Sequence, residues 1–320
     1  MRPSPGLRVP PLASLALAAA ALLAAACSGN GGEGGTPALT GDVTIDGSST
    51  VFPITEAVAE EFMAEHPDVR VTVGVSGTGG GFERLCRGET QISNASRPIR
   101  DAERQLCAQH GITDVVELFV AFDGLSVLVN PQNTFVDCLT TAELKRIWEP
   151  GSTVRTWRDV RADWPADPIR LYGPGTDSGT FDYFTEVVVG QADASRADYT
   201  ASEDDNVLVQ GIAGDRNALG YFGYAYYVEN RDRLKLVAVD GGGGCVRPSP
   251  QTIEDGTYTP LSRPLFIYTS ADLLRERPEL AAFVRYYLTE GRSLAAEVGY
   301  VPGNEARYRE GLDRLEAALR

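Results

Sequence analysis

The chain is organised around one run of small and polar residues, which reads Gly173-Pro174-Gly175-Thr176-Asp177-Ser178-Gly179-Thr180-Phe181-Asp182-Tyr183-Phe184. The apolar residues 169–172 before it are typical of a buried strand, and residues 181–189 after it have the apolar spacing of a helix. The first N–H groups of a helix lack partners within it, and the peptide dipoles add positive potential there, so an anion is stabilised. The Ser178 and Thr180 hydroxyls can donate to that anion, and Gly179 lets it approach the main chain. The run is therefore predicted to form one third of an oxyanion cradle.

Two further junctions of the same chemistry precede it, Asp46-Gly47-Ser48-Ser49-Thr50-Val51-Phe52-Pro53 and Ser76-Gly77-Thr78-Gly79-Gly80-Gly81. The first lies between strand-like residues 43–45 and helix-like residues 54–65, and the second between residues 69–75 and 82–85 of the same two types. A single cluster of this kind is more often only a helix cap. Three of them in one chain are hard to explain as independent caps.

Composition limits the classes of function. The 320 residues are 43% hydrophobic and 23% charged, an ordinary globular composition with enough chain for two domains. The formal net charge of −15 argues against nucleic-acid binding, which normally shows a basic face. An acidic protein that binds an anion must do so through local dipoles and not through its overall field.

The N-terminus is predicted to be a lipoprotein-type signal peptide over residues 1–26. Arg2 and Arg8 precede the apolar residues 12–26, a run that is short for a bilayer span and ends in small residues. The following Leu23-Ala24-Ala25-Ala26-Cys27 resembles a bacterial lipoprotein cleavage box, which implies lipid modification of Cys27. Ala24 departs from that box, and ordinary cleavage leaving a free secreted protein is the alternative. The glycine-rich residues 27–41 predict a flexible tether.

Four other cysteines are predicted to form two disulfides. Export permits disulfides, and Cys86, Cys107, Cys138 and Cys245 allow three pairings. We favour Cys86–Cys107, which flanks one local segment, and Cys138–Cys245, which would close a long middle region. No CxxC spacing occurs and the chain has only two histidines, so a zinc site is not expected.

The two histidines also bear on catalysis. A Ser-His triad around Ser178 would need a histidine beside the serine. His66 precedes Pro67 at a predicted helix end and His110 precedes Gly111 in a polar connection, so both are expected at the surface.

A candidate cation follows the second junction. Gln91-Ile92-Ser93-Asn94-Ala95-Ser96-Arg97-Pro98-Ile99 is typical of a short strand that ends in a polar turn. A guanidinium can bind a tetrahedral oxyanion through two parallel hydrogen bonds, so Arg97 is the candidate cation of the site. The alternative is a solvated surface charge.

Together these motifs resemble the PstS family, the phosphate-binding proteins of bacterial phosphate ABC transporters. The resemblance covers roughly residues 41–320 in the family's order. It implies an α/β, two-lobed fold of the periplasmic-binding-protein-like type II class, with a mixed sheet flanked by helices in each lobe and the ligand in the interlobe cleft. The implied function is an extracytoplasmic solute-binding protein that captures inorganic phosphate and delivers it to a membrane permease powered by a separate ATPase. We expect a monomer without cofactor, metal or enzyme activity, lipid-anchored at the outer face of the cell membrane.

By motif position, the resemblance implies phosphate contacts from three groups of residues: Ser49, Thr50 and the Val51 N–H; Thr78 and Gly79; and Ser178, Gly179 and Thr180. Two positions depart from the best-known members. Ser96 stands where they have an aspartate that accepts the phosphate proton, and Pro174 stands where they have an arginine. We expect Arg97 to supply the missing cation. Asp46 and Asp177 are candidate replacement acceptors, or simply loop and N-cap residues. Because rejection of sulfate needs an acceptor for the phosphate proton, another oxyanion stays an alternative ligand.

The family's two chain crossings predict the lobes. Residues 42–122 with 265–320 are assigned to one lobe and residues 123–264 to the other. The chain would leave the first lobe in the apolar residues 116–129, with a break at Gly124, and return at 264–269. Helices are expected at 141–148, 206–213, 271–290, where Pro278 interrupts or restarts the helix, and 304–319, and the aromatic residues 219–227 are expected to be a packed strand.

Two other classes of function stay open. A phosphohydrolase using the same cradle would lack a histidine base or a histidine-bearing metal cluster. A lipid-anchored phosphate sensor or surface adhesin would put the same fold to another use.

Overall fold

The computed structural model describes residues 39–176, 178–202 and 204–320. The predicted signal peptide, Cys27 and most of the predicted tether lie outside these residues, and so does Asp177. Within the described residues, no helix has the length and apolar character needed to cross a membrane.

A first group of strands has the order β2-β1-β3-β11-β4. It consists of β1 (Gly41–Gly47), β2 (Val69–Val73), β3 (Ile92–Ala95), β11 (Ser262–Ser270) and the first part of β4 (Val115–Val129). β1 is parallel to β2 and β3, and β11 is antiparallel to β3 and β4. The helices that follow these strands are α1 (Phe52–Glu65), α2 (Gly77–Cys86), α3 (Asp101–Gln109), α10 (Ala271–Glu276), α11 (Pro278–Thr289), α12 (Gly291–Glu297) and α13 (Glu305–Ala318).

A second group of strands is built on the last residues of β4. Leu125–Val129 pairs with β8 (Ala218–Gly223), which in turn pairs with β6 (Arg170–Gly173), and β7 (Thr200–Ala201) lies beyond β6. β9 (Lys235–Asp240) joins β4 to β5 (Cys138–Thr140) and β10 (Cys245–Val246). The helical segments are α4 (Thr141–Trp148), α5 (Trp157–Val160), α6 (Gly179–Phe184), the π-helix η1 (Thr185–Val189), α7 (Asp205–Gly214), α8 (Tyr224–Glu229) and α9 (Pro250–Glu254).

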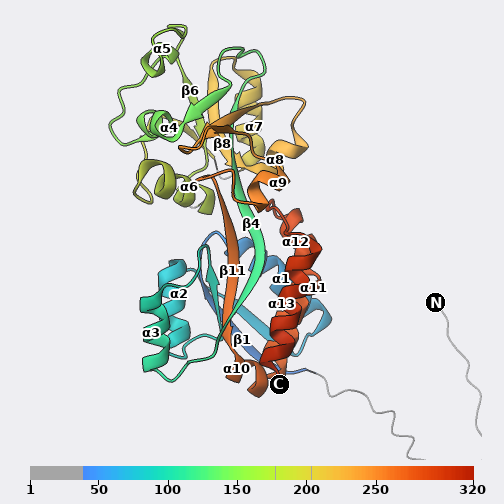
Figure 1. Cartoon of the computed structure of the whole chain (residues 1–320). Helices are drawn as coiled ribbons and strands as arrows, with labels where there is room; N and C mark the ends of the chain where they lie inside the picture. Colours follow the sequence, from blue (N-terminus) through green and yellow to red (C-terminus); the bar gives the residue numbers. More distant parts are fainter. Residues whose placement is uncertain (1–38, 177, 203) are drawn as a thin grey trace, which may run out of the picture. The chain divides into compact units, whose positions relative to one another are not determined.

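Strand β4 belongs to both groups, and β11 runs beside it (Figure 1). The break predicted at Gly124 is wrong, because β4 continues through this residue without interruption. A Cβ at residue 124 would lie 2.6 Å from Cδ1 of Ile253, so the glycine makes room for a neighbouring side chain. The two predicted chain crossings therefore correspond to two long strands that are hydrogen-bonded to each other.

The aromatic residues 219–227 also differ from the expected single strand. The strand ends at Gly223 and Tyr224–Glu229 form α8. Tyr224 and Tyr227 are three residues apart, so a helix brings their rings to one face, with ring centroids 5.9 Å apart. Tyr221 remains in β8, and its ring stacks on the Phe184 ring with the two ring centroids 3.7 Å apart.

Most other predicted elements are confirmed with small shifts of boundary. Residues 141–148 form α4 as expected, and residues 181–189 fall within α6 and η1. The helix predicted over 271–290 is divided into α10 and α11, with Pro278 in the first turn of the second. Helix α12 was not predicted.

Candidate functional site

The first junction depends on Gly47, where a side chain would clash with the neighbouring strand. Gly47 ends β1 with φ of +141°, and a Cβ there would lie 2.2 Å from the carbonyl oxygen of Asn94 in β3. The Ser48 N–H donates to the same carbonyl at 3.0 Å. This close approach of two parallel strands places Ser48, Ser49 and Thr50 at the start of α1.

The polar turns meet around a cavity of about 520 Å³, which we name the central cavity. It is lined by Ser48, Ser49, Thr50, Gly77, Thr78, Gly79, Ser96, Arg97, Arg100, Asp182, Tyr183, Glu186, Val187, Ala192 and Arg263. Six predicted site residues are among them, namely Ser49, Thr50, Thr78, Gly79, Ser96 and Arg97. Residues from the first two junctions and from the turn after β3 thus share one space.

The third junction opens into a neighbouring hollow of about 370 Å³. Ser178, Gly179 and Thr180 line this hollow together with Ser49, which also lines the central cavity. The Ser178 hydroxyl accepts a hydrogen bond from the Thr180 N–H at 3.2 Å, so it caps α6. Val51 is fully buried and its N–H donates to the Ser48 carbonyl at 3.2 Å, so this N–H is already paired.

The first and third junctions are in direct contact. The Ser49 hydroxyl donates to Asp182 at 3.0 Å, and the Thr50 hydroxyl donates to the Gly179 carbonyl at 3.5 Å. A Cβ on Gly179 would lie 2.9 Å from Cα of Thr50. Gly179 is therefore required for the two backbones to approach this closely.

The second junction is tied to the turn after β3. The Thr78 and Ser96 hydroxyls are 3.0 Å apart, and the Ser96 N–H donates to the Thr78 hydroxyl at 3.2 Å. A Cβ on Gly79 would meet nothing within 4 Å, so the main chain of α2 is open to the cavity at this residue.

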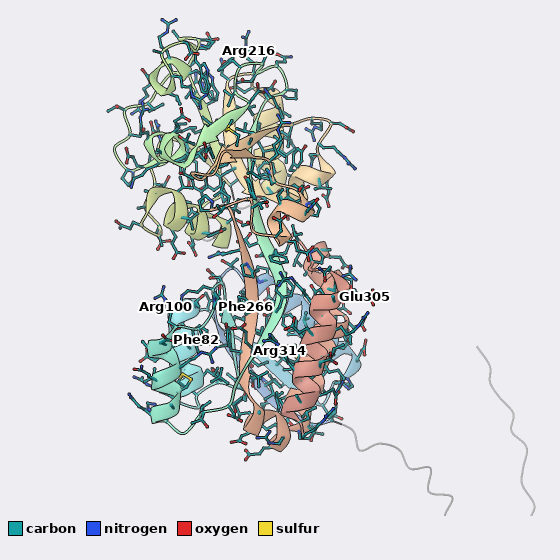
Figure 2. The ribbon with its side chains drawn as sticks, in the orientation of Figure 1. Phe82, Arg100, Arg216, Phe266, Glu305 and Arg314 are labelled. Carbon is teal, nitrogen blue, oxygen red and sulfur yellow. A yellow bond between two sulfur atoms is a disulfide. The ribbon has the colours of Figure 1, made fainter. Side chains whose placement is uncertain are left out.

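Arg97 lines the central cavity but is held by a carboxylate. Its two terminal nitrogens donate to the two oxygens of Glu103 at 2.9 and 2.7 Å. The hydrogen bond to Glu103 raises the pKa of Arg97. Burial alone would raise the pKa of Glu103, but the hydrogen bonds from Arg97 and from the Arg100 N–H keep it below its ordinary value. Phe82, on α2, lies beneath the Arg97 guanidinium, and Figure 2 shows Phe82 and Arg100 in this part of the first group.

The two candidate acceptors are placed differently. Asp46 accepts a 2.5 Å hydrogen bond from Ser76 and forms a 3.1 Å ion pair with Arg84, and it lines neither space. These contacts connect the end of β1 to the start of α2. Asp177 lies outside the described residues.

Among the lining residues that sequence reasoning did not single out, Arg263, Asp182 and Tyr183 make the closest contacts with the predicted site. Arg263 donates to the Thr50 hydroxyl at 2.7 Å and to Asp123 at 3.4 Å. Its guanidinium carbon lies 3.6 Å from the centre of the Tyr183 ring. Asp182 and Tyr183 belong to the run that organises the chain, and Arg263 directly precedes the predicted return strand, but their side-chain directions carry no local signal.

The pKa of the Asp182 carboxyl group is higher than usual. Burial, together with a hydrogen bond to the Asp193 side chain, raises the pKa of Asp182 to about 6, although the Ser49 hydrogen bond opposes this shift. A carboxyl group that can hold a proton near neutral pH therefore faces the central cavity.

Both predicted disulfides are confirmed. Cys86 is bonded to Cys107, which joins α2 to α3, and Cys138 is bonded to Cys245, which joins β5 to β10. Within the described part of the chain, histidine, cysteine and acidic side chains form no group that could hold a metal ion. Neither His66 nor His110 lines the central cavity.

Comparison with known proteins identifies close relatives. The family model of the PBP superfamily domain matches residues 32–290. The protein SphX of Synechocystis is 50% identical over 279 residues, which are 86% of this chain and 83% of the relative. The phosphate-binding protein PstS of Staphylococcus saprophyticus is 41% identical over 298 residues, 93% of this chain and 91% of the relative. The crystal structure of a possible phosphate-binding protein from Planctomyces limnophilus is 50% identical, has a TM-score of 0.84, and covers 88% of this chain and 100% of its own.

Proposed function

The chain belongs to the PBP superfamily and, within it, to the family of PstS phosphate-binding proteins, and from this premise we propose that it captures inorganic phosphate outside the cytoplasm and delivers it to an ABC-type permease. The family consists of two-lobed substrate-binding proteins of transporters and not of enzymes. The observation that carries the proposal is the convergence of hydroxyl, N–H and guanidinium donors on the central cavity.

Ten residues are proposed as the phosphate site: Ser49, Thr50, Val51, Thr78, Gly79, Ser96, Arg97, Ser178, Gly179 and Thr180. In support, six of them line the central cavity, and Ser178 to Thr180 line a neighbouring hollow that shares Ser49 with it. The tenth, Val51, donates its N–H to the Ser48 carbonyl in this structure and would have to release it. Hydroxyl and amide donors bind a small oxyanion strongly when water is excluded, because the bonds are charge-assisted. Asp46 or Asp177 stays our proposed acceptor of a phosphate proton.

We also propose that residues 42–122 with 265–320 form one lobe and residues 123–264 the other. The pairing of β4 with β11 supports this division, because these strands are the only predicted crossings. Closure of two lobes about two connecting strands is a common hinge motion, and it would bring further donors onto the bound anion.

Attachment to the membrane is proposed on sequence grounds. Signal cleavage after residue 26, lipid modification of Cys27 and a tether over residues 27–41 would hold a monomeric binding protein near its permease. Replacement of Cys27 by alanine should release the protein from membranes into the soluble fraction. Protein that stays in the membrane fraction after this change would contradict the lipid anchor.

Another oxyanion is the second candidate ligand. At the positions where an acceptor was expected, Ser96 is bonded to Thr78, and both oxygens of Asp46 are engaged by Ser76 and Arg84. Within the described residues these two side chains are therefore engaged, and acceptance of a phosphate proton is what would distinguish phosphate from sulfate, which carries no proton at neutral pH.

Calorimetry of the purified chain with phosphate, sulfate, arsenate and molybdate tests both candidates. We expect one phosphate per chain, and Ser49→Ala should weaken binding about tenfold because one hydrogen bond to a charged group is lost. Ser293→Ala is the matched control, since Ser293 is exposed on α12. The proposal fails if phosphate gives no binding signal, and the oxyanion alternative gains if sulfate or molybdate binds more tightly.

A further inference from the structure

We propose that Arg263, on strand β11, is the principal cation of the anion site, in place of Arg97. The proposal rests on the proposed function and names which side chain neutralises the ligand. Arg263 lines the central cavity and only 13% of its side chain is exposed to solvent. A charge that is shielded from water interacts more strongly with an anion than an exposed charge does.

The guanidinium of Arg263 is held in one orientation by the Tyr183 ring. Its carbon lies 3.6 Å from the centre of the Tyr183 ring, so it packs against the ring face. Face-on packing of this kind leaves the N–H groups, which lie in the guanidinium plane, free to form hydrogen bonds. One of these N–H groups donates to the Thr50 hydroxyl at 2.7 Å. This hydrogen bond also orients Thr50, which is itself a proposed phosphate ligand.

Several N–H groups of Arg263 remain available to an anion after these contacts. Nε makes a long 3.4 Å bond to Asp123, and Nη1 takes part only in a 3.9 Å ion pair with the exposed Glu186 among the described residues. Nη1 carries two N–H groups, and Nη2 has a second one besides that used by Thr50. This leaves a two-pronged set of donors suited to two oxygens of one phosphate.

The other two arginines of the cavity are less suited. Both terminal nitrogens of Arg97 already bind Glu103, at 2.7 and 2.9 Å, so an anion would have to compete with a carboxylate. Arg100 is exposed, and water and salt screen its charge. Glu103 thus neutralises Arg97 more completely than Asp123 neutralises Arg263.

Asp123 balances the buried charge when no anion is present. It lies directly opposite Arg263 in the register of β4 and β11, and it is buried. Burial raises the pKa of Asp123 while the Arg263 charge opposes this shift, and the single long contact of 3.4 Å leaves the other donors of Arg263 to an anion. The cation therefore lies on β11 and its carboxylate partner on β4, the two strands that we propose carry the chain between the lobes, so anion binding acts directly on this strand pair.

Two double variants of equal net charge test the assignment. Arg263→Gln/Asp123→Asn and Arg97→Gln/Glu103→Gln each remove one ion pair without leaving an unpaired charge. Titration calorimetry of the full chain with inorganic phosphate should show a loss of roughly 100-fold for the first and of less than about tenfold for the second. Equal losses, or the reverse order, would overturn the proposal.

A single variant covers the case in which the first double variant does not fold. Arg263→Lys keeps the charge but loses the planar fork, and we expect phosphate affinity to fall about tenfold. Arg216→Lys is the matched control, since this arginine is exposed and lines no part of the cavity (Figure 2). Wild-type affinity in Arg263→Lys would overturn the proposal while leaving phosphate capture intact, whereas a wild-type chain that binds no phosphate would overturn both.

Discussion

The Ser49 hydroxyl donates a 3.0 Å hydrogen bond to the Asp182 carboxylate, although 133 positions separate the two residues in the sequence. The bond connects the turn before α1 with the first residues of α6. Ser49 is a proposed phosphate ligand, so in this structure a protein carboxylate occupies a donor that an anion would use.

The shifted acid strength of Asp182 predicts a pH-dependent stability. Its pKa rises from 3.8 to about 6 on folding, so between these values the folded chain holds a proton that the unfolded chain releases. The free energy of unfolding should therefore decrease as pH rises through this window, by about 1 kcal/mol after allowance for the partial exposure of the side chain. In Asp182→Asn this decrease should be absent. Urea unfolding at about pH 4 and about pH 7 measures the difference.

Asp313→Asn is the control for this experiment, because Asp313 is exposed on α13. An Asp182→Asn variant with the same pH dependence as Asp313→Asn would show that Asp182 titrates normally.

Two glycines of the site should respond differently to alanine. In Gly179→Ala the new Cβ would lie 2.9 Å from Cα of Thr50, so the junctions must separate, with a loss of about 1–3 kcal/mol in stability and weaker phosphate binding. In Gly79→Ala the new Cβ meets nothing within 4 Å, so stability should be unchanged or slightly higher while the methyl group hinders an anion at the main chain. Thermal unfolding and calorimetry separate the two effects. Equal stability losses would contradict the close approach of Gly179 to Thr50.

The two disulfides should differ in their contribution to stability. Cys86 and Cys107 are 21 positions apart, and Cys138 and Cys245 are 107 apart. Constraint of the unfolded chain predicts losses of about 3 and about 5 kcal/mol when each pair is replaced by serine. Denaturant unfolding of the two double serine variants measures this order. A larger loss for Cys86→Ser/Cys107→Ser would show that native packing around α2 and α3 outweighs loop closure.

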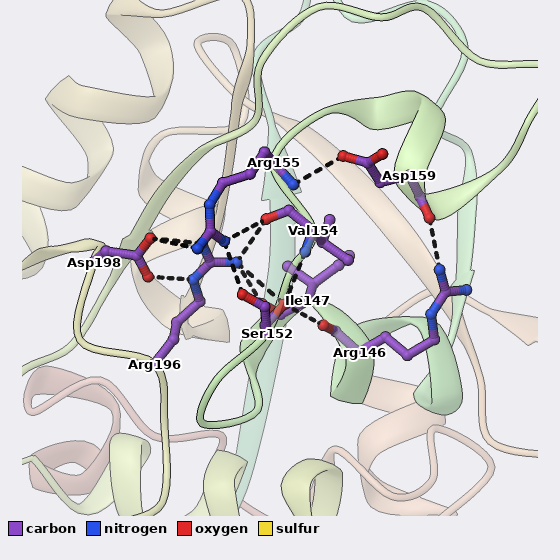
Figure 3. Close-up of polar contacts among 8 residues, drawn as sticks. All are labelled: Arg146, Ile147, Ser152, Val154, Arg155, Asp159, Arg196 and Asp198. Carbon is purple, nitrogen blue, oxygen red and sulfur yellow. Dashed lines mark hydrogen bonds and ion pairs between the residues drawn. The ribbon is translucent and has the colours of Figure 1, made fainter.

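Arg196 should be important for stability and not for binding. Its side chain is 6% exposed, and it donates to the carbonyls of Ile147 and Val154 and to Asp198, as Figure 3 shows. Arg196→Met keeps the length of the side chain but removes the donor to the Ile147 carbonyl, while the Val154 carbonyl keeps its bond from Arg155, and we expect a cost of about 2–4 kcal/mol. Phosphate affinity of the folded variant should be unchanged, because Arg196 lines neither space of the site.

The matched control for Arg196 is Arg155→Met. Arg155 reaches Asp198 at 3.6 Å and donates to the Ser152 and Val154 carbonyls at 2.9 Å, but its side chain is 58% exposed, so its replacement should cost less than about 1 kcal/mol. Equal destabilisation by the two variants would mean that burial of Arg196 is not the source of its effect.

The two disulfides are the pairing that we favoured among the three that the sequence allows. The sequence by itself determined the three strand-to-helix junctions and the two apolar segments that form β4 and β11. These features depend on the order of residues along short segments, where small residues permit tight turns and apolar spacing selects strand or helix. The site residues Ser49, Thr50, Thr78, Gly79, Ser96 and Arg97 could be predicted for this reason, since each lies where a predicted element begins or ends, whereas their meeting in one cavity depends on the tertiary structure.

Only the tertiary structure decided which side chains are partners. The sequence could not show that Glu103 engages both terminal nitrogens of Arg97, or that Arg263 reaches Thr50 across 213 positions. Nor could the sequence show that Ser178 lines the neighbouring hollow and not the central cavity. Hydrogen bonds and burial depend on distances between residues that are remote along the chain, and no local pattern of residues encodes those distances.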